Sequence, residues 1–126
     1  MNDTALKTYL DGWSKICNAT SETEEAMVSG AHPEVRFTDV NSPNVHAGHD
    51  GIRHLCKLAT GKYPDARLDM HDLLFDGRNW SVRWTMSGTR PDGSAFTRRG
   101  ASAGSVADDG RVIEHTDYWS RGDAAG

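Results

Sequence analysis

The first third of the chain carries apolar residues at helical spacing. Over residues 4–16 they recur every three or four positions, which predicts a helix with one apolar face made of Leu6, Tyr9, Leu10, Trp13 and Ile16. Ser21 with Glu24 three residues later predicts the start of a second, shorter helix through a capping box. Gly30 and Pro33 predict its end.

The pattern then changes to alternation. Residues 35–40 place Val35, Phe37 and Asp39 on one face, which predicts a short strand closed by the turn-rich residues 41–44. Asp50 follows as the predicted N-cap of a third helix over about residues 51–60.

The second half of the chain predicts four strands joined by hairpins. The strands cover about residues 66–75, 79–89, 95–107 and 111–119, and each is separated from the next by a turn that contains Gly. Because each amphipathic face must be buried against another element, this order predicts an α+β fold. We expect a cone-shaped roll, in which N-terminal helices pack on a curved antiparallel sheet, mixed at its edge, and enclose a pocket.

Length and charge narrow the class of protein. A chain of 126 residues predicts one domain, over residues 1–120, with a frayed tail at 121–126. The net charge of −4 argues against nucleic acid or an anionic membrane as partner. The sequence contains no membrane-length apolar stretch and no signal-peptide pattern at its start, so we expect a cytoplasmic protein.

The cysteines and histidines do not point to a bound group. Cys17 and Cys56 are far apart, with no further cysteines to complete a disulfide framework or a zinc site. The histidines at positions 46, 49 and 54 match no zinc spacing. We therefore expect neither a metal nor a cofactor.

Asp39 is the first candidate for chemistry. It ends the predicted strand on the same face as Phe37, and we expect it to lie near Tyr9 and Trp13. A carboxylate among aromatic side chains is desolvated, which makes it a better proton acceptor than an exposed one. The alternative is that Asp39 caps the turn at residues 41–43 from outside.

Asp117 is the second candidate. Ile113, His115, Asp117 and Trp119 share one face of the last predicted strand. If this face looks into the cone, His115 and Asp117 lie close enough to be linked through a water and to act as orienter and base. The alternative is a solvated pair at the edge of the sheet.

Arg83 lies on the polar face of the strand over residues 79–89, opposite an apolar face that contains Trp80 and Trp84. The apolar face must be buried, either in the pocket or in a dimer interface. In the second case Arg83 would point into the cone as a hydrogen-bond donor. The alternative is an exposed arginine on the surface of the sheet.

Four segments together resemble a known family. They are Tyr9-x-x-x-Trp13, Val35-Arg-Phe-Thr-Asp39, Gly48-His-Asp-Gly-Ile-Arg53 and Gly110-Arg-Val-Ile-Glu-His-Thr-Asp-Tyr-Trp119. They resemble the SnoaL-like and ketosteroid-isomerase-like branch of the nuclear transport factor 2-like superfamily, over nearly the whole chain. The resemblance implies the same cone-shaped fold and a homodimer that pairs through the sheet.

The resemblance implies two different bases. Asp39, nine residues before Gly48, resembles the general base of ketosteroid isomerases, and Tyr9 resembles their oxyanion tyrosine. Their second oxyanion donor, an acid, falls near Ser102, and residues 95–106 contain no Asp or Glu. Asp117 resembles instead the base of SnoaL-like polyketide cyclases and limonene epoxide hydrolases.

The epoxide-hydrolase pattern is incomplete in this chain. An Arg-x-Asp motif completes the site of those hydrolases, whereas this sequence has Arg83-Trp84-Thr85. One Asp would then have to activate water without its acid partner.

These observations predict a cofactor-independent isomerase, cyclase or dehydratase that moves a proton next to a carbonyl of a small polyketide- or steroid-like compound. The alternatives are epoxide opening and a non-catalytic binding or dimerisation module. The predicted catalytic residues are Asp117, Asp39, Tyr9, His115 and Arg83. The predicted substrate-binding residues are Trp13, Phe37, Leu55, Met70, Trp84, Ser102 and Trp119. The expected partners are a small apolar ligand and a second copy of the chain.

Overall fold

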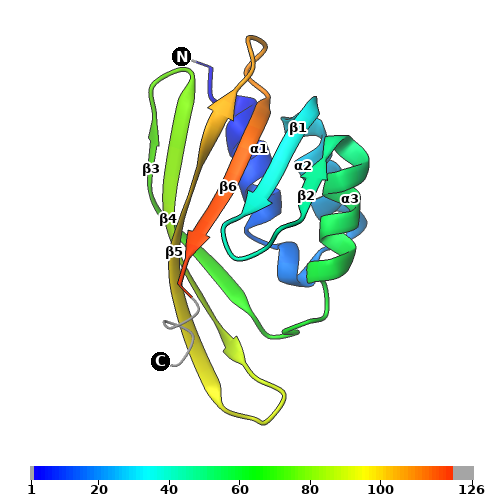
Figure 1. Ribbon diagram of the computed structural model, residues 1–126, viewed down its shortest axis with the longest axis vertical. Helices are drawn as coiled ribbons and strands as arrows, with labels where there is room; N and C mark the ends of the chain where they lie inside the picture. The colour runs from blue at the N-terminus through cyan, green and yellow to red at the C-terminus, as the bar shows by residue number, and fades with distance from the viewer. Residues whose placement is uncertain (1, 121–126) are drawn as a thin grey trace.

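A computed structural model describes residues 2–120 and shows three α-helices on one face of a curved six-stranded sheet (Figure 1). The helices are α1 (Thr4–Trp13), α2 (Ser21–Gly30) and α3 (Gly48–Ala59), with a short 3₁₀ helix η1 (Ile16–Asn18) between the first two. The strands are β1 (Ala31–Asp39), β2 (Val45–Ala47), β3 (Arg67–Phe75), β4 (Asn79–Thr89), β5 (Ala95–Val106) and β6 (Val112–Trp119). The predicted α+β class is confirmed, and the tail predicted at 121–126 lies outside the described residues.

The sheet is mixed and does not close into a barrel. Its strand order is β2-β1-β6-β5-β4-β3, and β1 and β6 are its parallel pair. This pair joins the two halves of the chain and sets Phe37 beside His115 and Asp39 beside Asp117. The two candidate carboxylates therefore sit on neighbouring strands, which lie about 4.8 Å apart in a sheet.

The starts and ends of two helices differ from the prediction. Helix α1 ends at Trp13, and Ile16 reaches the core from η1 instead. The N-cap of α2 is Thr20 and not Ser21, because the Thr20 hydroxyl accepts the N–H of Thr23 at 3.2 Å. A neighbouring hydroxyl residue can fill the same role, so sequence spacing left the cap ambiguous by one position.

The segment between α2 and α3 differs more. Helix α3 begins at Gly48, and Asp50 lies in its first turn, where a negative charge favours the helix dipole, without serving as its cap. Strand β1 runs through Pro33, where its pairing with β6 is irregular and the missing N–H of proline removes no ladder bond. Strand β2 was not predicted, because three residues are too few to show alternation.

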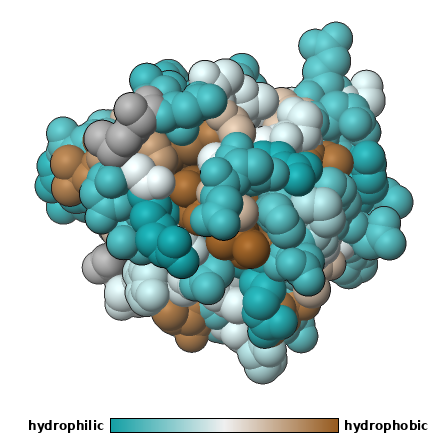
Figure 2. Space-filling model, turned by 90° about the horizontal axis from the view of Figure 1, so that it is seen from above, coloured by the Kyte–Doolittle hydropathy of each residue, from teal (hydrophilic) through white to brown (hydrophobic). Residues whose placement is uncertain are grey.

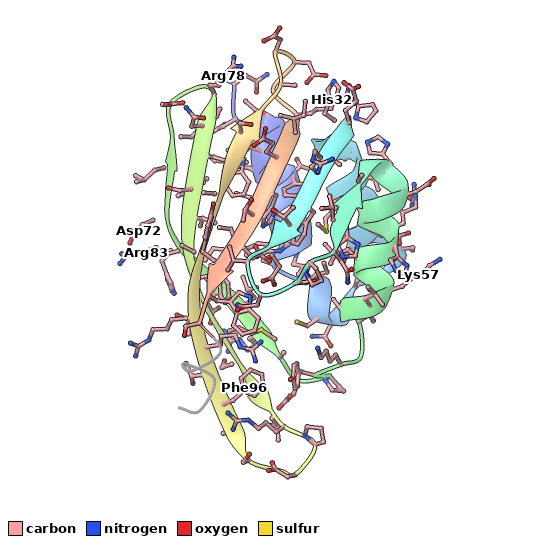
Figure 3. The ribbon with its side chains drawn as sticks, viewed as in Figure 1. His32, Lys57, Asp72, Arg78, Arg83 and Phe96 are labelled. Atoms are coloured by element: carbon pink, nitrogen blue, oxygen red, sulfur yellow. The ribbon has the colours of Figure 1, made fainter. Side chains whose placement is uncertain are left out.

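The tryptophan face of β4 belongs to the core of the chain. Trp80, Val82 and Trp84 are buried against the helix side of the sheet, so they are not available for a dimer interface. Arg83 lies on the outer face of the sheet, where it pairs with Asp72, away from the helices (Figure 3). A homodimer through the outer face stays a prediction.

The surface of the molecule is largely polar, as expected if the apolar face of β4 is buried in the core. Seen from above, the molecule is mostly hydrophilic, with hydrophobic residues in a few small patches (Figure 2). Within residues 2–120, no helix is long and apolar enough to cross a membrane.

Strand β5 uses glycine where two tryptophans pack against it. A Cβ at Gly104 would meet the carbonyl of Glu114 on β6 and approach the Trp80 ring to 3.0 Å. A Cβ at Gly100 would meet the ring of Trp84. The missing side chains let the tryptophan rings lie directly on the strand.

Replacing Gly104 with Ala should lower the free energy of unfolding by roughly 2–4 kcal/mol, because the backbone of Glu114 cannot move aside without breaking the ladder. Denaturant unfolding followed by tryptophan fluorescence measures it. The matched control is Ser105→Ala at the next position of the same strand, which should change stability by less than about 0.5 kcal/mol. Equal effects of the two changes would contradict this packing.

Candidate active site

A pocket of about 320 Å³ opens between the sheet, α1, η1 and α3. We call it the central pocket. Among the residues predicted to form the site, those that line it are Trp13, Phe37, Asp39, Leu55, Trp84, Asp117 and Trp119. Its wall is largely apolar, with two carboxylates at one end, which suits an apolar ligand with a few polar groups.

His115 and Asp117 are in direct contact, without the bridging water that the sequence suggested. His115 Nε2 lies 2.6 Å from Asp117 Oδ1, and the Tyr9 hydroxyl lies 2.7 Å from His115 Nδ1. Tyr9 and His115 are fully buried, whereas the Asp117 side chain is 14% exposed and reaches the central pocket. The buried side chains of Tyr9 and His115 therefore support, from the core, a carboxylate that lines the pocket.

Asp117 is held from a second side by Ser102. The two residues are paired across β5 and β6, and the Ser102 hydroxyl donates to Asp117 Oδ1 at 2.6 Å. Trp84 Nε1 in turn donates to Ser102 Oγ at 3.0 Å. Ser102 was predicted to bind substrate, but its side chain is fully buried and its hydroxyl is hydrogen-bonded to Asp117.

One arrangement of protons satisfies the whole network. Tyr9 donates to Nδ1 of a neutral His115, Nε2–H of His115 donates to an ionised Asp117, and Ser102 donates to the same carboxylate oxygen. Burial raises the pKa of Tyr9 well above its usual value, and the nearby charge of Asp117 raises it further. Tyr9 therefore remains a hydrogen-bond donor at neutral pH.

Asp39 combines the two roles that the sequence left open. It lines the central pocket, and it also caps the turn after β1, because Oδ1 accepts the N–H of Asn41 at 2.8 Å. Trp119 Nε1 donates to both carboxylate oxygens of Asp39, at 3.1 and 2.9 Å. By contrast, Oδ2 of Asp117 accepts no hydrogen bond from the residues that the structure describes.

Two predicted residues lie outside the central pocket. Arg83 is 72% exposed on the outer face of the sheet, since the alternation of β4 that buries Trp84 turns its neighbour outward. Met70 is 37% exposed on β3, near the edge of the sheet. The structure therefore corrects the prediction for both residues.

Sequence reasoning missed two cations on the wall of the central pocket. Lys62 follows α3, and Arg98 lies on β5. Arg98 shares a strand face with Ser102, so alternation along β5 could have placed it on the pocket side. Among residues 2–120, no group of three or more His, Cys, Asp or Glu side chains is placed to hold a metal ion.

A larger hollow, of about 700 Å³, lies between α1, α2 and the start of β3. Exposed side chains such as Asp11 and Lys15 contribute to its wall, and it contains neither candidate carboxylate. The central pocket is the better candidate site, because the buried hydrogen-bond network ends there.

One known family matches most of this chain. The model of the SnoaL-like domain matches residues 9–115, a span from the tyrosine to the histidine of the network. The chain belongs to the SnoaL-like family. No curated protein matches its sequence.

Solved structures share the SnoaL-like fold. A candidate SnoaL-like polyketide cyclase from Jannaschia sp. CCS1 is 18% identical with a TM-score of 0.74, over 91% of this chain and 84% of that one. A candidate isomerase of the SnoaL-like family from Agrobacterium tumefaciens is 19% identical with a TM-score of 0.69, over 93% and 98%. A Mycobacterium tuberculosis protein, in complex with estradiol-17β-hemisuccinate, is 11% identical with a TM-score of 0.72, over 97% and 98%.

The raised pKa of Tyr9 predicts a stability change in alkali. Above pH about 10 the unfolded chain loses the phenol proton, whereas folding keeps it on Tyr9. The free energy of unfolding should therefore fall as pH rises above about 10, whereas below that pH the stabilisation by Tyr9 is fully present and does not depend on pH. Tyr9→Phe should remove this part of the slope and cost about 1–2 kcal/mol at neutral pH, because His115 Nδ1 loses its donor.

Denaturant unfolding of both proteins, from about pH 8 to about pH 11, measures the difference in slope. Burial also raises the pKa of the Cys56 thiol to about 11, which adds an alkaline slope common to both proteins. Identical slopes for Tyr9→Phe and the unchanged protein would contradict the assignment.

Proposed function

We propose that this protein is a cofactor-independent acid–base enzyme that acts on a small apolar carbonyl compound, with Asp117 as its general base. The observation that carries the proposal is the asymmetry of the Asp117 carboxylate. Oδ1 is held by His115 and Ser102, while Oδ2 has no partner within residues 2–120 and the side chain reaches an apolar pocket. A base must be fixed in direction and still have a lone pair for the substrate.

The proposed step is removal of a proton from the carbon next to the carbonyl. The proton moves to Asp117 Oδ2, and the electron pair of the broken C–H bond moves into the enolate. Returning the proton to another carbon completes an isomerisation, and loss of a β-hydroxyl as water completes a dehydration. A water-poor wall favours both, since it strengthens electrostatic interactions with the developing charge.

Tyr9 and His115 act in this proposal as positioning residues. Both are fully buried and bond to each other, so neither reaches a ligand in the central pocket. This role differs from the one that the resemblance implies for Tyr9, which is that of an oxyanion donor. Ser42 lines the same pocket beside Asp39, and its oxygen accepts the N–H of Asn44, which leaves its own O–H to donate to the enolate.

Neighbouring folds support the use of this pocket for small molecules. Structures of similar fold were solved with polyporic acid, trimethylamine or estradiol-17β-hemisuccinate. Epoxide opening has less support, because Arg83 lies on the outer face of the sheet and cannot orient an epoxide in the central pocket.

Exchange of α-protons for deuterium, followed by NMR over a panel of enolisable aryl and cyclic ketones, tests the proposal. Asp117→Asn should lower the exchange rate about 10²- to 10⁴-fold. Asp39→Asn is the matched control: it changes the neighbouring carboxylate, which already accepts three N–H contacts, and should have a smaller effect.

Full exchange activity in Asp117→Asn would reject this base. Absence of exchange with every ketone, in a protein that still binds them, would favour a non-catalytic binding module.

A further inference from the structure

Arg98 is held inside the central pocket by aromatic rings. Its guanidinium carbon lies 4.3 Å from the centroid of the Trp119 ring and 5.5 Å from that of Phe96. Figure 3 shows Phe96 toward the end of the molecule where the β4–β5 hairpin extends. Contact with two rings holds the guanidinium in place and leaves its terminal N–H groups to bind an acceptor.

Arg98 has no acid partner within the described residues. Its Nε is buried without a hydrogen-bond partner, and no hydrogen bond or ion pair joins its other nitrogens to residues 2–120. Four other arginines, by contrast, form ion pairs with carboxylates: Arg53, Arg67, Arg83 and Arg111. A partly buried guanidinium that pairs with no carboxylate of residues 2–120 favours the binding of an anion, which would offset its desolvation.

The charges in the central pocket are separated along β5. Ser102 is paired with Asp117, and Arg98 lies four residues before Ser102 on the same face of β5, roughly 13 Å along the strand backbone. Trp84, Met86 and Trp119 contribute apolar wall to the same pocket. Lys62 adds a second cation, which also forms no ion pair within the described part of the chain.

From this separation we propose that the natural substrate is an apolar carboxylic acid, whose carboxylate binds the Arg98 guanidinium while its reacting carbon lies against Asp117. The planar fork of arginine matches a carboxylate with two parallel N–H···O bonds. The negative charge of Asp117 repels a carboxylate from its side of the pocket, so the substrate binds in one direction. This inference rests on the proposed function, for which it names the substrate class.

The test compares two probes that differ by one charge. They are δ-benzoylvalerate, an aryl ketone with a terminal carboxylate, and its neutral methyl amide. Calorimetry should show that the protein binds the acid at least about tenfold more tightly than the amide. Arg98→Gln should abolish this preference without changing the affinity for the amide.

The matched control is Arg99→Gln, at the next position and exposed on the other face of β5, which should keep the preference. Arg98→Lys retains the charge without the planar fork, so this variant should keep only part of the preference for the acid over the amide. Equal binding of acid and amide, failure of the acid to bind, or a preference that survives in Arg98→Gln would overturn the proposal.

The same probes separate this inference from the proposed function. Asp117→Asn should still prefer the acid, since it removes the base and not the guanidinium. Deuterium exchange next to the ketone reports on the base alone. A preference for the acid without any exchange would leave anion recognition standing and reject the catalytic role of Asp117.

Discussion

The imidazole of His115 is the constraint on which the rest of the site depends. It is fully buried, and aromatic rings from Tyr9, Trp13, Phe37 and Trp80 surround it, with centroids 4.2 to 5.6 Å away. A polar ring in such a place costs free energy unless both nitrogens are paired, at about 1–3 kcal/mol for each group left unpaired. Tyr9 pairs with Nδ1 and Asp117 pairs with Nε2, and these two hydrogen bonds fix the orientation of both side chains.

The orientation of the Asp117 carboxylate in the pocket follows from that pairing. Asp117 reaches back to the buried imidazole with Oδ1, and its side chain also lines the central pocket. Ser102 on β5 also donates to Oδ1 of Asp117, and Trp84 holds the Ser102 hydroxyl in place. The carboxylate at the end of the pocket is thus oriented by the core, and the apolar packing that stabilises the fold also positions the candidate base.

Membership of the SnoaL-like family is shown by the sequence match, but a shared fold hosts many reactions and does not name this one. Three side chains carry the proposed chemistry: Asp117, whose Oδ2 accepts no hydrogen bond within residues 2–120; Asp39, whose carboxylate caps a turn; and Arg98, whose guanidinium forms no ion pair within the same residues. In the proposal, Asp117 supplies the base, Arg98 supplies the cation, and apolar side chains line the same pocket.

Local patterns were enough to predict the α+β class, most element positions and the face that His115 shares with Asp117, because helix and strand periodicities are local properties of the chain. Three outcomes depended on tertiary structure. The parallel pairing of β1 with β6 put Asp39 beside Asp117, the choice of buried face sent Arg83 outward, and the curvature of the sheet brought Arg98 into the pocket. Alternation states which residues share a face, but only packing against the helices decides which face is buried.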